Sequence, residues 1–388
     1  MSVYLDHAAT TPLRPEVLDA MQPYLLEHFG NPSSIHGPGR RARLGLDEAR
    51  ETVARVLGAK PREIVFTGGG TEADNLAVKG AAWAASARGR EIVVSAVEHK
   101  AVTHSAAVME RFGFGVTWLP VDRYGRVDPA DVEAAIGDHT TLVSVMYANN
   151  EVGTIQPVAE IGAICRQRGV LFHVDAIQAA GHLPLDVDAL NADLLSLSAH
   201  KLYGPKGVGA LFVRQGTALL AQHSGGSQER QRRAGTENVA GIVGFARALE
   251  LADAERIEAG ERLRALRDRL VAELTAEPGV MLTGHPVDRL PNSASFLVDA
   301  VEGGDLVAAL DLEGIAASTG SACTTGSTDP SHVLLAMGIE PEAAHGSLRL
   351  TLGRGSSDED VRLTVEAMRR VLGRIRDASQ QRPEVASV

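Results

Sequence analysis

The sequence predicts an α/β protein whose main domain is joined to a smaller α+β unit. Between about residues 60 and 215, short apolar, β-branched runs alternate with helix-like stretches. Past Val239 the composition changes: the sequence becomes rich in Ala, Leu, Glu and Arg, with apolar residues at helical spacing. The 388 residues are 44% hydrophobic and 22% charged, which argues against disorder and suits a large core divided between two domains.

Seven apolar runs predict the strands of the main sheet, at residues 64–66, 92–94, 116–119, 141–147, 170–174, 194–197 and 208–213. Helical patterns lie between most of them, for example at residues 72–85 and 158–168. Strands that alternate with helices favour a mostly parallel sheet covered on both faces.

The smaller unit is predicted from a second series of elements. A long helix is predicted at residues 242–276. Strands are predicted at 280–282, 295–298 and 347–352, and helices at 306–312 and 358–375. The tail, 380–388, has no apolar periodicity. We expect the tail to be frayed. The predicted large domain spans 12–255, and 1–11 with 256–388 form the small domain.

Composition also limits the classes of function. The net charge of −11 does not favour nucleic-acid binding. No apolar run approaches the roughly 18 residues of a membrane span, and the N-terminus lacks the pattern of a secretory signal. Only Cys165 and Cys323 are present, too few for a disulfide scaffold, so we expect a cytoplasmic protein.

Three segments could carry chemistry. Residues 67–72, Thr-Gly-Gly-Gly-Thr-Glu, join a strand to a helix and could cradle a phosphate, although a merely structural glycine turn explains them equally well. Lys201 follows a buried strand and could form a Schiff base, or could be a surface lysine. Asp175 ends another strand and could pair with a pyridinium nitrogen or cap the next helix.

Together, a phosphate cup, an acid and a lysine at strand ends indicate a pyridoxal 5′-phosphate site. The chain resembles the cysteine desulfurases of the class V aminotransferase superfamily, in the group of nitrogen-fixation and iron–sulfur-cluster-assembly enzymes. The matching motifs are Tyr4–Thr11, Gly70–Glu72, Glu98–Lys100, Asn149–Gly153, Asp175 with Gln178, Ser198–Gly209, Arg233–Thr236, Gly320–Thr324 and Leu348–Leu350.

The resemblance implies a fold-type I transferase and a homodimer with pyridoxal 5′-phosphate as cofactor. It implies that Lys201 holds the cofactor and moves protons, that His99 stacks on the ring and assists, and that Asp175 pairs with the ring nitrogen. The phosphate would be bound by Gly70, Thr71, Ser198, His200 and, from the other subunit, Thr236. Gln178 and Asn150 would bracket the phenolic oxygen and the substrate, whose carboxylate Arg349 would grip.

Several of these residues have simpler interpretations. A histidine such as His99 near a loop is often structural, Arg349 could make an ordinary ion pair, and Asn150 could cap a turn. The motif matches favour the functional interpretation of each.

Cys323 lies in a loop of small polar residues, 318–331, which has little apolar anchorage and is therefore expected to be mobile. A desulfurase needs such an accessible thiolate, whereas a transaminase does not. Cys165 lies among apolar residues on a predicted helix and is expected to be a buried small hydrophobe.

The predicted function is conversion of L-cysteine to L-alanine, with the sulfur left on Cys323 as a persulfide for an acceptor or iron–sulfur scaffold protein. In complex with such a scaffold, Cys323 could also be a transient cluster ligand. The alternatives are a selenocysteine lyase, another class V reaction such as transamination, or a docking scaffold without catalysis. We expect neither nucleic acid nor a membrane as a partner.

Overall fold

The structure is a computed structural model that describes residues 2–320 and 330–380 of the chain. The predicted sulfur carrier Cys323 and most of the predicted frayed tail lie outside the described residues. Within these ranges, no helix is both long enough and apolar enough to cross a membrane.

The main sheet has seven strands in the order β2-β8-β7-β6-β5-β3-β4. Its strands are β2 (Ile64–Thr67), β3 (Glu91–Ser95), β4 (Gly115–Leu119), β5 (Thr140–Ser144), β6 (Leu171–Asp175), β7 (Leu194–Ser198) and β8 (Gly209–Val213). Each of the seven strands overlaps a predicted run, but β5 ends at Ser144, whereas the run was predicted to extend to residue 147. Only β8 runs against the others, because it pairs antiparallel with both β2 and β7.

Helices cover both faces of this sheet, because its strands carry apolar side chains on both faces. One face packs on α1 (Pro15–Leu26), α2 (Gly37–Val56), α7 (Val158–Arg168) and the first part of α8 (Val239–Thr275). The other face packs on α3 (Gly70–Asn75), α4 (Ala81–Ala85) and α5 (Lys100–Glu110), while α6 (Pro129–Ala135) lies near β4 and α7. The helix predicted at 72–85 is interrupted by a π-helical turn, Leu76–Gly80, between α3 and α4.

The smaller lobe is built on a three-stranded antiparallel sheet in the order β12-β10-β9. Its elements are β9 (Val280–Leu282), β10 (Ser293–Val298), α9 (Gly303–Leu312), α10 (His332–Ala336), α11 (Pro341–Ala344), β12 (Ser347–Thr351) and α12 (Asp358–Gln380). A separate two-stranded sheet pairs β1 (Val3–Tyr4) with β11 (Ile315–Ala316) in parallel.

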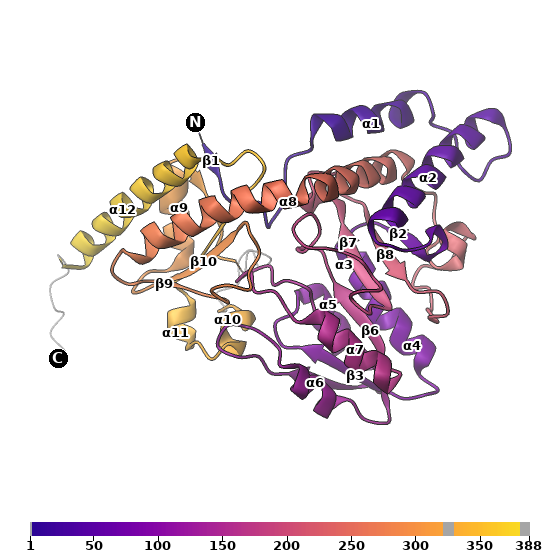
Figure 1. The fold of residues 1–388 in the computed structure, drawn as a ribbon, viewed down its shortest axis with the longest axis horizontal. Coiled ribbons are helices and arrows are strands. Elements are labelled where there is room, and N and C mark those ends of the chain that lie inside the picture. The colour runs from indigo at the N-terminus through magenta and orange to yellow at the C-terminus, as the bar shows by residue number, and fades with distance from the viewer. Residues whose placement is uncertain (1, 321–329, 381–388) are drawn as a thin grey trace.

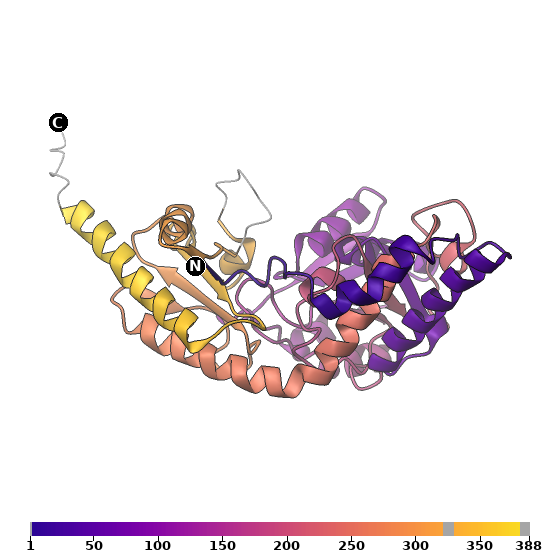
Figure 2. The ribbon, with the colours of Figure 1, turned by 90° about the horizontal axis from the view of Figure 1, so that it is seen from above.

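Helix α8 belongs to both lobes, and Figures 1 and 2 show it running from one to the other. Its residues 242–249 pack in the core of the main sheet, whereas Leu263, Leu266, Leu270 and Leu274 pack in the core of the smaller lobe. Val3 and Leu5 also belong to the second core. The domain boundaries at residues 12 and 255 stay a prediction.

Candidate active site

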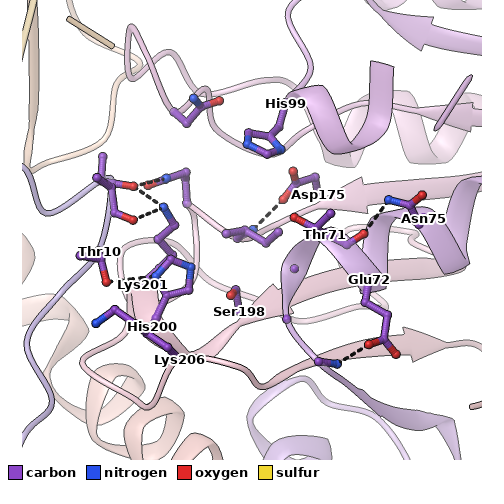
Figure 3. Close-up of a pocket in the computed structure, with 18 of the residues that line it drawn as sticks. Thr10, Thr71, Glu72, Asn75, His99, Asp175, Ser198, His200, Lys201 and Lys206 are labelled. Carbon is purple, nitrogen blue, oxygen red and sulfur yellow. Dashed lines mark hydrogen bonds between the residues drawn. The ribbon is translucent and has the colours of Figure 1, made fainter. Parts of the chain in front are cut away.

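A cavity of about 1030 Å³ opens at the carboxyl ends of the central strands, where α/β proteins bind ligands. Ten of the predicted site residues line it: Gly70, Thr71, His99, Asn150, Asp175, Gln178, Ser198, His200, Lys201 and Arg349. Figure 3 shows several of them around the cavity. They come from both lobes and from segments far apart in the sequence.

The glycine turn after β2 forms one end of this cavity. Gly69 has φ +147°, a conformation that favours glycine, and a Cβ on Gly70 would lie 2.2 Å from Ile177 Cδ1 and 3.3 Å from Ser198 Cβ. The first backbone N–H groups of the helical segment that starts at Gly70 have no carbonyl acceptor within the helix, so they can donate hydrogen bonds to an anion.

Lys201 lies in the 3₁₀ turn Ala199–Lys201 directly after β7. Its ammonium donates hydrogen bonds to the carbonyl oxygens of Ala8 and Ala9, the latter at 2.8 Å. The Ala8 carbonyl also accepts a bond from Gln178 Nε2 at 2.9 Å. Lys201 is therefore held inside the cavity by the N-terminal segment.

Asp175 ends β6 and is only 4% exposed. Its Oδ1 accepts a hydrogen bond from the backbone N–H of Ile177 at 2.9 Å, which is the turn-capping contact that the sequence left open. Burial raises the pKa of Asp175 to about 6, while the Ile177 N–H and the charge of Lys201 act to lower the pKa. The carboxylate thus caps a turn and also lines the cavity.

A buried polar network lies beneath Asp175. On the neighbouring strands, Ser144 Oγ and Ser196 Oγ lie 2.8 and 2.9 Å from the two ring nitrogens of His173. Burial lowers the pKa of His173 to about 3. Burial, followed by the charge of Asp175, raises the pKa values of the fully buried Asp74 and Glu98 well above their usual range. Of these three buried carboxyls, Asp175 is the one that lines the cavity.

His99 caps α5, because its Nδ1 accepts a hydrogen bond from the backbone N–H of Ala101 at 3.1 Å. Burial and the charge of Lys201 lower the pKa of His99 to about 4, so the ring is neutral at pH 7. With Nδ1 as an acceptor, its proton lies on Nε2. Burial lowers the pKa of His200 to about 4 as well, and His200 Nδ1 lies 3.1 Å from Thr10 Oγ1.

Two predicted residues are not brought to this cavity. Thr236 is exposed and outside the lining, which agrees with a predicted role toward another subunit without testing it. Cys323 lies outside the described residues. Cys165 is fully buried as predicted, and burial raises the pKa of its thiol to about 12.

Sequence reasoning missed other lining residues, among them Thr10, Lys206, Gln222 and His223. Thr10 and Lys206 lie within the matched motifs and could have been found there. Gln222 and His223 lie in a segment without such a pattern. No group of three or more metal-ligating side chains occurs in the part of the chain that the structure describes.

The donor set fits pyridoxal 5′-phosphate. The hydroxyls of Thr71 and Ser198 line the cavity beside Gly70 and offer hydrogen-bond donors to a phosphate. A buried carboxylate, Asp175, offers a partner to a pyridinium, and Lys201 offers an amine to an aldehyde.

The fold and cavity define an α/β protein with a lysine and an acid at neighbouring strand ends, in a cavity whose lining fits an anionic cofactor. The chain belongs to the class-V aminotransferase family, whose model matches residues 3–363. The chain is 50% identical over 383 residues to the cysteine desulfurase IscS of Dictyoglomus turgidum, covering 98% of this chain and 97% of that one.

Solved structures agree with this assignment. A NifS-like protein superposes with a TM-score of 0.91 at 39% identity, covering 96% of this chain and all of the other. SspA in complex with cysteine superposes with a TM-score of 0.81 at 35% identity, covering 90% of this chain and 99% of the other. The predicted fold class and the predicted cysteine desulfurase group are confirmed by these matches.

Proposed function

We propose that this protein is a pyridoxal 5′-phosphate-dependent cysteine desulfurase that converts L-cysteine to L-alanine and leaves the sulfur on Cys323 as a persulfide. The observation that carries the proposal is the meeting of Lys201, Asp175 and the glycine cradle in one cavity. The IscS relatives and the cysteine complex of SspA support the same reaction and substrate.

In this proposal the residues that line the cavity would hold the cofactor. Gly70, Thr71, Ser198 and His200 would bind its phosphate, and Asp175 would pair with its ring nitrogen. Lys201 would supply the amine that its aldehyde needs, His99 would lie against the ring, and Gln178 would contact the phenolic oxygen. When bound, the cofactor supplies an electron sink that stabilises negative charge at the substrate α-carbon.

The residues of the chain supply proton transfer and orientation. Once the substrate amine had displaced it from the aldehyde, the free Lys201 amine would take the α-proton of the substrate and return a proton to carbon. Neutral His99 can donate the proton on Nε2. Arg349, with Asn150, holds the substrate carboxylate.

Cys323 decides the reaction type. Its thiolate attacks the substrate sulfur and the substrate C–S bond breaks. The electron pair of that bond stays on carbon, which accepts a proton to become the methyl group of alanine. The transferred sulfur remains on Cys323, from which we propose that it passes to an iron–sulfur scaffold or other acceptor protein in the cytoplasm.

The two cysteines provide the test and its matched control. Cys323→Ser should keep the cofactor colour and a spectral response to L-cysteine but lose persulfide formation and nearly all alanine release. Cys165→Ser should keep activity, because that thiol is fully buried and its raised pKa keeps it protonated. Mass spectrometry after brief exposure to L-cysteine should place one extra sulfur on the Cys323 peptide. Alanine release by Cys323→Ser at the wild-type rate would refute the mechanism.

A selenocysteine lyase is distinguished by its substrate. Such an enzyme would release selenium from selenocysteine without needing Cys323, so the Cys323→Ser variant would stay active toward that substrate. Parallel assays of alanine release from cysteine and selenocysteine separate the two activities.

A further inference from the structure

The N-terminal motif Tyr4–Thr11 has no role in the proposed mechanism, yet it reaches into the cavity. Strand β1 anchors it to β11, and the Ala8 N–H donates to Thr351 Oγ1 at 2.9 Å. Ala8, Ala9 and Thr10 line the cavity. Asp6, two residues before Ala8, contacts Arg349.

The Arg349 guanidinium is fixed along one edge. Its Nη2 donates to Asp6 Oδ1 at 2.8 Å, and its Nη1 donates to the carbonyl oxygens of Asn150 at 2.8 Å and Gly320 at 3.3 Å. The side chain of Arg349 is 4% exposed and that of Asp6 is 20% exposed. Arg349 is therefore a buried cation whose neutralising partner comes from the N-terminal segment.

In the described parts of the chain, the Nε side of the guanidinium lacks such partners. Arg349 Nε is buried and has no hydrogen-bond partner among the residues that the structure describes. A guanidinium has five N–H donors, and the three contacts above use the Nη1 pair and one N–H of Nη2. The Nε–H and the second Nη2–H form the side edge, which matches the two oxygens of a carboxylate.

We propose that Asp6 is a positioning residue: it holds Nη2 of Arg349, while two backbone carbonyls hold Nη1, and the Nε–Nη2 edge is so presented to the substrate carboxylate. The inference deepens the proposed function and rests on it. It also gives the ion pair between Asp6 and Arg349 a function: the pair orients the guanidinium and leaves some of its N–H donors without a protein acceptor in the part of the chain that the structure describes.

The sign of the effect distinguishes positioning from competition. If Asp6 positions Arg349, its removal weakens binding of the substrate carboxylate. If Asp6 instead occupies the carboxylate site, its removal strengthens that binding. The turnover step should change little either way, because Asp6 would act on the substrate through Arg349, with which it forms an ion pair.

The test compares Asp6→Ala and Asp6→Asn with the wild-type holoenzyme. For Asp6→Ala we expect the KM for L-cysteine to rise about tenfold or more, with kcat within about threefold, as loss of a charge-assisted contact predicts. Asp6→Asn keeps a hydrogen-bond acceptor but not the charge, so its KM for L-cysteine should lie between those of the wild type and Asp6→Ala. The dissociation constant for L-cysteine, from the cofactor spectrum in a Cys323→Ser background, should follow the KM.

Cysteamine, which is cysteine without its carboxylate, is the ligand control. Its dissociation constant, measured in the same way, should be the same for wild type and Asp6→Ala. Tyr4→Phe is the matched variant, because it removes the hydrogen bonds of the Tyr4 hydroxyl to the carbonyl oxygens of Asp6 and Thr10 and keeps the Asp6 carboxylate. It should leave the KM within about twofold of wild type, since exposed neutral hydrogen bonds contribute little.

An unchanged or lowered KM for Asp6→Ala would overturn the inference, and so would an equal loss of affinity for cysteamine. If the wild-type enzyme released no alanine from L-cysteine, the proposed function would be refuted instead. The dissociation constants from the cofactor spectrum would still test the role of Asp6. If Asp6→Ala fails to fold, as its melting temperature would reveal, the partial effect of Asp6→Asn carries the test.

Discussion

At the scale of single residues, Lys201 has the most specific environment. Two carbonyl oxygens of the N-terminal segment hold its amine inside the cavity. A surface lysine would have no such contacts. The proposed chemistry needs this amine both to bind the cofactor and to move protons.

Lys201→Ala is therefore expected to abolish turnover, with alanine release falling by at least about a thousandfold. The absorbance band of the covalently bound cofactor should disappear while the melting temperature of the apoprotein changes little. Substantial alanine production by purified Lys201→Ala would remove Lys201 from the mechanism.

The raised pKa of Asp175 gives a second prediction at this scale. Because the pKa is about 6, the carboxylate of the protein without cofactor becomes protonated as the pH falls through 6 and can no longer pair with a pyridinium. Wild-type affinity for pyridoxal 5′-phosphate should fall across that range more steeply than that of Asp175→Asn. The asparagine variant should also lose about a hundredfold or more in kcat, because the electron sink weakens. Parallel pH profiles of the two proteins would contradict the assignment.

Residues such as these differ in how far the sequence could predict them. Lys201 and Asp175 follow apolar strands, so their position at the sheet edge is encoded locally. Asp6 and Arg349 are 343 residues apart, and only the folded chain brings them together. Sequence reasoning assigned Arg349 either an ion pair or a substrate carboxylate. The structure shows an ion pair with Asp6, and Arg349 Nε has no hydrogen-bond partner among the described residues.

At the scale of elements, the polar face shared by β5, β6 and β7 makes the fold sensitive to acid. His173 stays neutral in the folded protein because its pKa is lowered to about 3, whereas an unfolded histidine has a pKa near 6.5. The unfolded chain therefore binds the extra proton, and stability is lost as the pH falls from about 6.5 toward 3.

His173→Gln should reduce this acid sensitivity. At pH 5 the histidine costs the folded state about 2 kcal/mol relative to pH 7, by the linkage of the two pKa values. The drop in melting temperature between pH 7 and pH 5 should thus be smaller in His173→Gln than in wild type. An equal drop in both proteins would show that other groups govern the acid response.

The loop before α8 depends on one buried ion pair. Glu229 contacts Arg50 through both oxygens, at 2.6 and 2.7 Å, and accepts a hydrogen bond from the Phe66 N–H at 3.0 Å. Glu229, Arg230 and Gln231 all have positive φ, between 45° and 66°, which non-glycine residues adopt at a cost. The ion pair holds this strained turn in place.

Glu229→Gln should destabilise the protein by about 3–5 kcal/mol, because it leaves Arg50 buried without its counter-charge. Denaturant melts read by circular dichroism measure the change. The matched control is Glu366→Gln, which breaks an exposed pair on α12 and should leave the melt nearly unchanged. Equal small effects of both substitutions would mean that the buried pair does not hold the turn.

At the scale of the whole molecule, the sequence predicts the layers better than the connections between them. The seven strands are recognisable because each is a short apolar run. The reversal of β8 and the β1–β11 pairing of distant segments arise from long-range contacts that no local pattern encodes. The role of Thr236 in the cavity of another subunit stays a prediction.

One end of the molecule carries large apolar side chains that a single chain leaves in water. They lie on α1, on α2 and on the connection between them: Leu18, Leu25, Leu26, Phe29, Ile35 and Leu44. Phe29 is 74% exposed and Ile35 is 90% exposed. Such a patch is typical of a protein interface, which supports the predicted homodimer.

Replacing both Phe29 and Ile35 by Asp should therefore shift the protein from dimer to monomer at micromolar concentration, as sedimentation velocity would show, because two buried charges would oppose association. If Thr236 completes the phosphate site of the partner subunit, the monomeric variant should also bind pyridoxal 5′-phosphate more weakly and lose activity. Leu312→Asp is the matched control, because Leu312 is equally exposed, at 90%, but lies on α9 in the other lobe (Figure 1). A wild-type protein that sediments as a fully active monomer would contradict both the interface and the proposed role of Thr236.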